Sequence, residues 1–239
     1  MPRKSERKVA VVTGASRGIG LAIAEALAKA GFDLAISARN QTQLKVAAEQ
    51  LAGSTTVLTE VCDVRDEKSV GQFFAAVKKK FGHIDTLVNN AGYAGALKEI
   101  AETSLDVWRD NLDTNLTGVF LCTRAALPLM RPGSTIVNNL SVAAKGFFPG
   151  MGAYVASKHG AMGFTLTLRA ELRPRGIRVI ALLPGATDTE IWDQFWPDVP
   201  REGMMSSESV ASSVVNAILL PDNATVEELV IMPTTGTLK

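Results

Sequence analysis

The sequence has little cysteine, little histidine and no long apolar run, and each shortage excludes a class of protein. Its 239 residues include only Cys62 and Cys122, too few and too isolated for a disulfide framework or a metal cluster. No apolar stretch approaches the roughly 18 residues of a membrane span, and no signal-peptide-like region follows the basic start MPRKSERK. The two histidines, His83 and His159, lack a partnered motif, so we expect no catalytic role for them. These absences favour a cytoplasmic protein without a bound metal and without membrane partners.

The charge balance is nearly neutral, with a formal net charge of +1 and interspersed signs. This leaves no basic stripe of the sort that nucleic acid requires, so nucleic-acid binding is disfavoured. With 46% apolar residues the chain can bury a substantial core, and no linker, repeat or low-complexity segment interrupts it. We therefore predict that residues 1–239 form one domain.

Short apolar segments alternate with helical stretches along the chain. This alternation predicts an α/β fold with a doubly wound, parallel, seven-stranded sheet and helices on both faces. In such sheets ligands bind beyond the carboxyl ends of the strands. The predicted strands are Val9–Thr13, Asp33–Ala38, Thr56–Val61, Ile84–Asn89, Thr135–Leu140, Arg178–Leu183 and Leu229–Met232.

A glycine-rich turn follows the first predicted strand. Gly14, Gly18 and Gly20 let the backbone turn sharply, and a helix that begins near Ile19 would offer free N–H groups to a phosphate. The glycines are spaced GxxxGxG rather than GxGxxG. The loop could therefore bind a dinucleotide phosphate in the same way as the general dinucleotide-binding motif, although its spacing differs from that motif. A tight strand-to-helix connection is the alternative interpretation.

Tyr154 and Lys158 are four residues apart, which places a phenol and an ammonium on one helical face. A nearby positive charge favours the phenolate, so Lys158 is expected to lower the pKa of Tyr154 toward the range of general acid–base catalysis. Taken alone, the pair could equally be a packed tyrosine beside a surface lysine.

Five motifs in order resemble the short-chain dehydrogenase/reductase family over nearly the whole chain. Besides TGxxxGxG and YxxxK, these are NNAG at Asn89–Gly92, Asn115 in DTNLTG, Ser141 in NNLSVAA and PGATDT at Pro184–Thr189. The resemblance implies a Rossmann-like fold and hydride transfer between a nicotinamide and a carbonyl carbon. It also implies catalytic roles for Asn115, Ser141, Tyr154 and Lys158.

The cofactor choice follows from the end of the second strand. Ala38 stands where members of the family that use NAD carry Asp, and Arg39 and Arg17 could hold a 2′-phosphate, so we predict NADP(H). The cofactor-binding residues implied are Gly14, Ser16, Arg17, Gly18, Ile19, Gly20, Arg39, Asp63, Val64, Asn90, Ala91, Gly92, Tyr154, Lys158, Pro184, Gly185, Thr187 and Thr189.

An aromatic segment follows Thr189, and we predict that about residues 188–205 form a substrate lid. Apolar side chains suited to an apolar ketone or aldehyde are Trp192, Phe195, Trp196, Phe147, Phe148 and Met151. Burial of these side chains against the scaffold or a neighbouring subunit is the alternative.

Two departures from the family pattern shape the functional prediction. Leu140 stands where the family has Ser, with Asn139 before it, and the end VEELVIMPTTGTLK lacks the DGG segment of many 3-oxoacyl reductases. We predict an NADP(H)-dependent carbonyl reductase or alcohol dehydrogenase; the alternatives are a 3-oxoacyl-[acyl-carrier-protein] reductase and a catalytically idle NADP-binding sensor or scaffold. The family further implies a homodimer or homotetramer through the helices around Asn115 and Tyr154.

Overall fold

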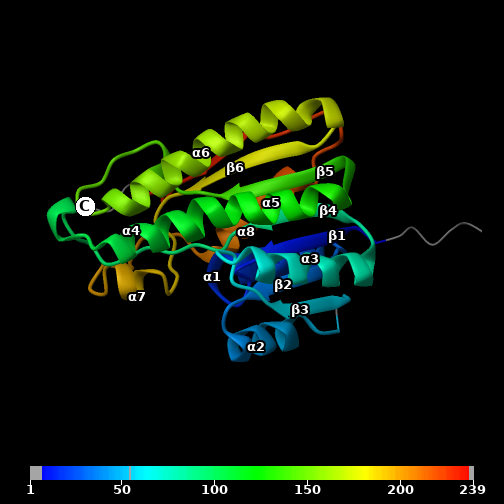
Figure 1. Cartoon of the computed structure of the whole chain (residues 1–239), viewed down its shortest axis with the longest axis horizontal. Coiled ribbons are helices and arrows are strands. Elements are labelled where there is room, and N and C mark those ends of the chain that lie inside the picture. The colour runs from blue at the N-terminus through cyan, green and yellow to red at the C-terminus, as the bar shows by residue number, and fades with distance from the viewer. Residues whose placement is uncertain (1–6, 54, 237–239) are drawn as a thin grey trace, which may run out of the picture.

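The structure is a computed structural model, and it describes residues 7–53 and 55–236. Seven parallel strands form one sheet in the order β3-β2-β1-β4-β5-β6-β7 (Figure 1). Because β1 and β4 lie side by side, the strand order reverses between them, and this is the point where α/β sheets bind ligands. The strands are β1 (Val9–Thr13), β2 (Asp33–Ala38), β3 (Val57–Val61), β4 (Ile84–Asn89), β5 (Met130–Asn139), β6 (Arg178–Pro184) and β7 (Glu228–Ile231).

The predicted fold class is confirmed, and the main difference in strand bounds lies in β5. This strand begins at Met130 rather than at the predicted Thr135. Met130 pairs with Ile84, but the register shifts between Ile84 and Thr86, so the early part of β5 bulges. Pro132 and Gly133 hid this part from the sequence pattern, because neither residue is typical of a strand interior.

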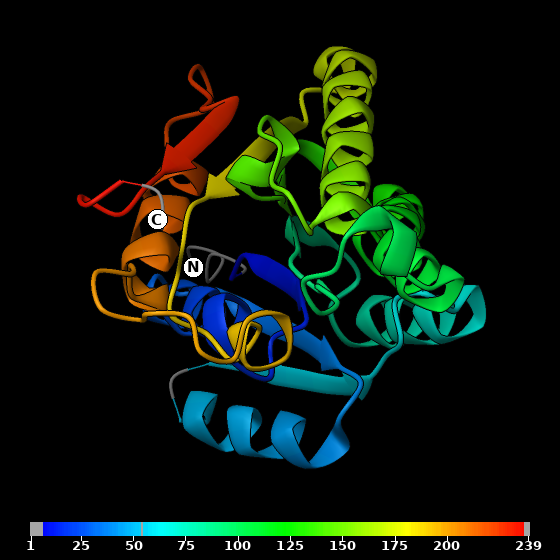
Figure 2. The same ribbon diagram turned by 90° about the vertical axis from the view of Figure 1, so that its left-hand side faces the viewer.

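Helices cover both faces of the sheet. One face packs against α1 (Gly18–Lys29), α2 (Gln41–Leu51) and α8 (Ser207–Ile218), with Val12, Ile36 and Leu182 in that core. The other packs against α3 (Glu67–Phe81), α5 (Gly118–Ala126) and α6 (Gly152–Leu172). In Figure 2, α8 (orange) and α6 (yellow-green) lie on opposite sides of the sheet. No helix within the described residues is long and apolar enough to cross a membrane.

A π-helical turn, η2 (Asp113–Thr117), joins α4 (Leu105–Leu112) directly to α5. Asn115 lies in this wide turn and is buried, with 1% of its surface exposed. Such turns are rare and occur frequently at functional sites. The sequence pattern gave no sign of it, since the segment reads as ordinary helix.

Short elements complete the chain around the carboxyl ends of the strands. The four-residue helix α7 (Trp192–Phe195) lies at the same end of the molecule as α4 and the start of α6 (Figure 1). The short 3₁₀ helices are η1 (Ile100–Glu102), η3 (Leu127–Leu129), η4 (Val142–Ala144) and η5 (Arg173–Arg175).

Candidate active site

A cavity of about 900 Å³ opens beyond the carboxyl ends of the strands. Every residue predicted to bind the cofactor lines it, together with Ser141, Tyr154 and Lys158. Segments far apart in the sequence therefore converge as the motif order predicted. Asn115 is the exception, because it lies behind the cavity wall rather than on it.

The glycine loop brings backbone rather than side chains to the cavity. Gly14 has a φ of +64°, and a Cβ there would lie 2.7 Å from the Cα of Ala91. Any larger residue would therefore clash with the NNAG segment as well as strain the backbone. Arg17 precedes α1 with an extended backbone and makes no side-chain cap, so the first N–H groups of α1 face the cavity unblocked. This cradle fits the phosphates of a dinucleotide.

The NNAG segment is fixed by Thr13 at the end of β1. The Thr13 hydroxyl accepts from the backbone N–H groups of Asn90 (3.1 Å) and Ala91 (3.2 Å). In return, the Asn90 side-chain Nδ2 donates to the carbonyls of Thr13 and Gly14, both at 3.0 Å. The glycine loop and the NNAG segment thus form one hydrogen-bonded unit across β1 and β4.

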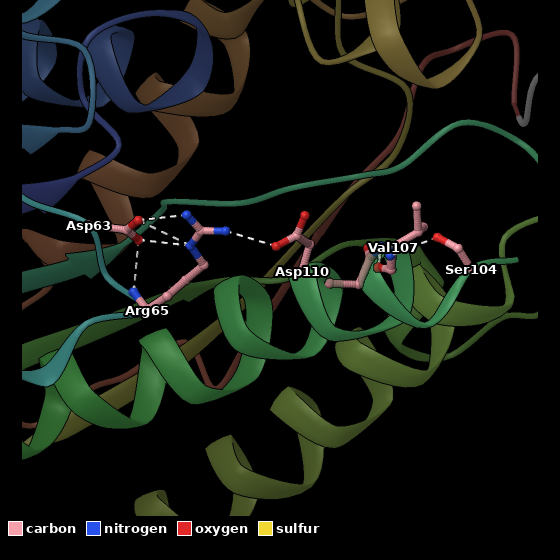
Figure 3. A network of polar contacts seen from close by, with 6 residues as sticks. Asp63, Arg65, Ser104, Val107 and Asp110 are labelled. Carbon is pink, nitrogen blue, oxygen red and sulfur yellow. Dashed lines mark hydrogen bonds and ion pairs between the residues drawn. The ribbon is translucent and has the colours of Figure 1, made fainter.

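Asp63, which the resemblance to the family would place against the adenine of the cofactor, is held by an arginine (Figure 3). Arg65 Nε donates to both Asp63 oxygens at 3.0 and 3.1 Å, and its Nη2 donates to Oδ2 at 2.7 Å. This bonding, together with the Arg65 backbone N–H, holds the pKa of Asp63 below its ordinary value. Arg65 also forms an ion pair with Asp110 of α4 at 2.8 Å. In Figure 3, Asp110 lies between Arg65 and the labelled residues Val107 and Ser104. Asp63 is therefore a paired carboxylate at the adenine end of the cavity.

The two predicted phosphate-binding arginines differ from Arg65 in having no such partner. Arg17 and Arg39 are exposed and line the cavity, and neither donates a hydrogen bond to another described residue. Ala38, at the end of β2, presents no carboxylate between them. Arg39 lies close enough to Asp63 to help lower the pKa of that carboxyl, but neither guanidinium is bound by a carboxylate among the described residues. Two such groups beside a neutral strand end create a site suited to a dianionic phosphate.

At the other end of the cavity, Tyr154 and Lys158 extend from α6, and Ser141 lies at the start of η4. Lys158 Nζ lies 5.5 Å from the centroid of the Tyr154 ring and donates to the carbonyl of Asn139 at 3.1 Å. The ammonium is buried, with only 5% of the residue exposed. The predicted proton-transfer groups are thus adjacent, with Lys158 shielded from bulk water and Tyr154 partly exposed.

The expected effect of Lys158 on Tyr154 is wrong in this structure. Burial raises the pKa of Tyr154 above its ordinary value, and the hydrogen bond with Ser141 offsets this only in part. Burial also lowers the pKa of Lys158, from 10.5 to about 8. Burial disfavours the charged form of each group, the phenolate and the ammonium, and it is the first cause of both shifts. Tyr154 is therefore protonated at neutral pH, as a proton donor must be.

Asn115 uses its side chain to hold the loop after β4. Its Oδ1 accepts from the backbone N–H of Tyr93 and its Nδ2 donates to the carbonyl of Tyr93, both at 2.8 Å. The same Nδ2 lies 2.9 Å from Ser157 Oγ, which itself donates to the Tyr154 carbonyl at 2.7 Å. Asn115 thus connects the loop after β4 to α6, and the buried Ser157 hydroxyl is its hydrogen-bond partner on that helix.

The substrate end of the cavity is apolar, with one correction to the predicted residues. Phe147 is 89% exposed and lies outside the cavity, because the chain turns there and only Phe148 points inward. Several wall residues were missed, since nothing in the sequence places the part of the loop beyond NNAG, or the segment after β7, near the substrate. The wall comprises Leu97, Phe148, Met151, Ile191, Trp192, Phe195, Trp196 and Met232, with Tyr93 and Gln194 as polar members.

The predicted lid is pinned at its base. Asp188 N–H donates to the Met205 carbonyl at 2.8 Å, so residues 188–205 form a loop with joined ends. Arg201 bridges Asp188 at 2.8 Å and Asp193 at 2.5 Å. Inside the loop, the Phe195 ring lies 6.2 Å from the Tyr154 ring, centroid to centroid. The loop therefore places an aromatic side chain directly against the candidate acid.

The histidines and cysteines lie away from this chemistry. His83 pairs with Asp85 at 3.1 Å at the start of β4, and His159 is exposed on α6. Cys122 is buried in the core, and Cys62 is buried with its backbone at the edge of the adenine end. Among the described residues no group of three or more potential ligands could hold a metal.

Comparison with known families gives a match to short chain dehydrogenase over residues 8–200. The chain belongs to the short chain dehydrogenase family. The predicted family and the predicted class of enzyme, an oxidoreductase, are therefore confirmed.

Relatives within the family act on different substrates. The chain is 38% identical to a 3beta-hydroxysteroid dehydrogenase of Mediterraneibacter gnavus, over 81% of this chain and 71% of the relative. It is 35% identical to sulfoacetaldehyde reductase 2 of Chromohalobacter salexigens, over 95% of this chain and 94% of the relative. A solved alcohol dehydrogenase of Thermococcus sibiricus, complexed with 5-hydroxy-NADP, superimposes with a TM-score of 0.90 at 33% identity, covering 98% of this chain and 100% of that one.

Proposed function

We propose that this short chain dehydrogenase is an NADP(H)-dependent carbonyl reductase and alcohol dehydrogenase for apolar substrates. The observation that carries the proposal is the meeting of Ser141, Tyr154 and Lys158 at the end of the cavity opposite to the arginines. Bound NADP(H) supplies the hydride, which a protein side chain cannot do. The chain supplies the binding site, the orientation and the proton.

The residues present fit the cofactor at both ends of the cavity. The helix N-terminus behind Gly14 and Gly18 suits the phosphates, and Arg17 and Arg39 suit the 2′-phosphate. Pro184, Gly185, Thr187 and Thr189 would hold the nicotinamide end, because they line the cavity beside the Tyr154 wall. The NADP-bound relative described above supports the same choice.

Tyr154 gives its phenolic proton to the carbonyl oxygen of the substrate in the reducing direction. Lys158 stabilises the resulting phenolate with its ammonium charge, and Ser141 donates a hydrogen bond to the substrate oxygen. In the oxidising direction the phenolate takes the proton from the alcohol. Since burial raises the pKa of Tyr154, the protonated form that the reducing direction needs is present at neutral pH.

The substrate class follows from the wall of the reacting end. Within the described residues, Lys158 is the only cationic side chain there, and its ammonium is already bonded to the Asn139 carbonyl. A sulfonate or phosphate group on the substrate would therefore lack a positively charged partner in this wall. Sulfoacetaldehyde carries a sulfonate and would need such a partner. Aromatic and aliphatic side chains instead suit a bulky, uncharged ketone or aldehyde.

The test is to follow NADPH consumption with a panel of uncharged ketones and aldehydes, sulfoacetaldehyde and an acetoacetyl thioester. We expect the highest kcat/KM with a bulky apolar ketone. A preference for the thioester would favour the 3-oxoacyl reductase, and a preference for the sulfonate would contradict the apolar site. NADPH binding without turnover of any compound would favour the idle binding protein.

The assembly and the location of the protein stay predictions. Large apolar side chains are exposed on α4, α5 and α6, including Leu105 (58%), Phe120 (41%) and Leu166 (44%). These would be covered in a homodimer or homotetramer formed through those helices. Light scattering that gives a monomer mass would contradict this assembly, and cell fractionation tests the cytoplasmic location.

A further inference from the structure

Asn139, the last residue of β5, controls where the Lys158 charge lies. The Asn139 carbonyl accepts from Lys158 Nζ at 3.1 Å, and no other described residue accepts a hydrogen bond from that ammonium. Asn139 also precedes Ser141 by two residues, on the same short stretch after the strand. A shift of this strand end would therefore move both groups relative to Tyr154.

The side chain of Asn139 anchors this strand end to the glycine loop. Its Nδ2 donates to Asn90 Oδ1 at 2.8 Å. The orientation of the Asn90 amide is fixed, because its Nδ2 donates to two carbonyls, those of Thr13 and Gly14. Asn90 Oδ1 must then be the acceptor, and Asn139 must present its N–H groups to it. A continuous chain of hydrogen bonds thus connects the phosphate cradle to Lys158.

The Asn139 side chain is an unfavourable choice if only the stability of the fold is considered. Asn139 Oδ1 is buried and has no hydrogen-bond partner among the described residues. An orphaned buried acceptor loses its solvation without compensation, so an apolar side chain would suit a purely structural position better. Asn139 moreover borders the cavity, where its amide is within the site rather than in the core.

We propose that Asn139 is a positioning residue that, through Asn90, holds the end of β5 so that its carbonyl fixes the Lys158 ammonium beside Tyr154. The proposal rests on the proposed function, since it assigns Lys158 the support of the phenolate. Loss of the Asn139 side chain leaves the carbonyl in the chain but releases its position. The ammonium then loses its acceptor in a buried site, so Lys158 gives up its proton at a lower pH and supports Tyr154 over a narrower pH range.

The test compares Asn139→Ala with Asn138→Ala, a matched variant of the neighbouring residue. The Asn138 amide is fully buried in the same strand and makes bonds of the same kind, accepting from Asn89 at 2.8 Å and donating to Thr165 at 2.9 Å. No hydrogen bond joins its side chain to Lys158 among the described residues. Both variants lose a buried amide, so differences between them report on the position of the ammonium rather than on the fold.

The first readout needs no turnover and follows Lys158 itself. Burial lowers the Lys158 pKa from 10.5 to about 8, so the titration of its Cε carbon by nuclear magnetic resonance, assigned with Lys158→Met, is separate from that of an ordinary lysine. We expect the Lys158 midpoint to fall by about 0.5–1 pH unit in Asn139→Ala, because the charged form loses its carbonyl acceptor. In Asn138→Ala we expect the thermal midpoint to fall while the Lys158 midpoint stays within error of the parent. Equal Lys158 midpoints in the two variants would overturn the proposal.

The second readout is the pH profile of ketone reduction with NADPH. We expect kcat of Asn139→Ala to fall about tenfold, a part of the full contribution of general acid catalysis, with the alkaline limb moved to lower pH as Lys158 loses its proton earlier. The other ionisable side chains lining the cavity among the described residues are Tyr93, Glu190, Arg17, Arg39, Asp63 and Cys62, and both variants retain them. An unmoved limb contradicts the proposal. If the parent enzyme reduces no ketone, the proposed function fails, and the Lys158 titration still decides the role of Asn139.

Discussion

The adenine end and the substrate end of the cavity are built on different physical principles. At the adenine end the chain offers backbone N–H groups and the cations Arg17 and Arg39, which donate no hydrogen bond to another described residue, and the carboxylate of Asp63 is paired with Arg65. At the substrate end Lys158 carries a buried charge, and the wall is aromatic and aliphatic. Tyr154 lies where the two ends meet.

The comparison teaches that cofactor choice and substrate choice depend on separate forces. Recognition by exposed arginines is electrostatic, and salt screens it over about 8 Å at physiological ionic strength. Recognition by the lid wall comes from apolar burial, which salt weakens little. Variants at one end should therefore leave the selectivity of the other end intact.

The largest effect is expected from Lys158→Met, at the boundary between the ends. Loss of the ammonium removes its support for the phenolate, so kcat should fall about 100-fold or more. NADPH binding, measured by fluorescence, should weaken far less, because the arginines and the glycine loop remain. Unchanged turnover would remove Lys158 from the mechanism.

The same variant should make the protein more stable. Burial holds the pKa of Lys158 at about 8 instead of 10.5, so the folded state carries an unfavourable charge below pH 8. The cost is on the order of 3 kcal/mol, and it disappears as the pH rises from 8 to 10.5. Urea unfolding should show Lys158→Met above the parent at pH 7, with the gap closing toward pH 10.5. A gap that does not change with pH would contradict the buried charge.

The double variant Arg17→Ala/Arg39→Ala tests the adenine end alone. Hydrogen bonds to charged groups contribute about 1.5–3 kcal/mol each, so the ratio of kcat/KM for NADPH to that for NADH should fall about 100-fold. The ranking of ketones should stay as in the parent. Arg175→Ala, an exposed arginine bonded to the Leu127 carbonyl, serves as the control for loss of a positive charge. A parent that prefers NADH would refute the cofactor assignment outright.

Trp192→Ala tests the substrate end. The Trp192 ring packs on Phe195 at 5.3 Å between centroids, and its Nε1 donates to the Thr187 carbonyl at 2.9 Å. We expect KM for bulky ketones to rise about tenfold through lost apolar burial, with small ketones little affected. The NADPH to NADH ratio should not move. Equal Michaelis constants across the ketone panel would show that the lid does not contact the substrate.

Arg201→Ala should have the smallest effect, because it only loosens the base of the lid. Arg201 bridges Asp188 and Asp193 near the surface, where ion pairs are weak. We expect KM for ketones to rise about threefold, with a larger change in low salt than in high salt. A drop in kcat without any change in KM would assign Arg201 to chemistry rather than to the lid.

Much of this arrangement could be predicted from the sequence. The glycine loop, the strand ends and the Tyr154–Lys158 pair follow from local patterns, because parallel strands bring their carboxyl ends to one edge. The lack of any regular period after Thr189 pointed to the aromatic segment that lines the cavity, and its role as a lid stays a prediction. Phe147 was wrong, since sequence proximity to the site cannot tell which of two adjacent aromatics points inward.

Other features required the structure because they depend on contacts between distant segments. The π-helical turn at Asn115 and the Asn139–Asn90 bond are set by packing across strands, which no local pattern records. The direction of the Tyr154 pKa depends on how completely the lid encloses the ring. A spacing of four residues predicts that two charges can interact, but not that both are desolvated.

The most direct test of the central claim, that Tyr154 is the proton donor where the two ends meet, is the turnover of Tyr154→Phe measured beside its NADPH affinity. Removing one hydroxyl should lower kcat for an apolar ketone about 1,000-fold, within the range of general acid catalysis, while the Kd for NADPH changes little. Turnover within a few-fold of the parent at unchanged NADPH affinity would contradict the account.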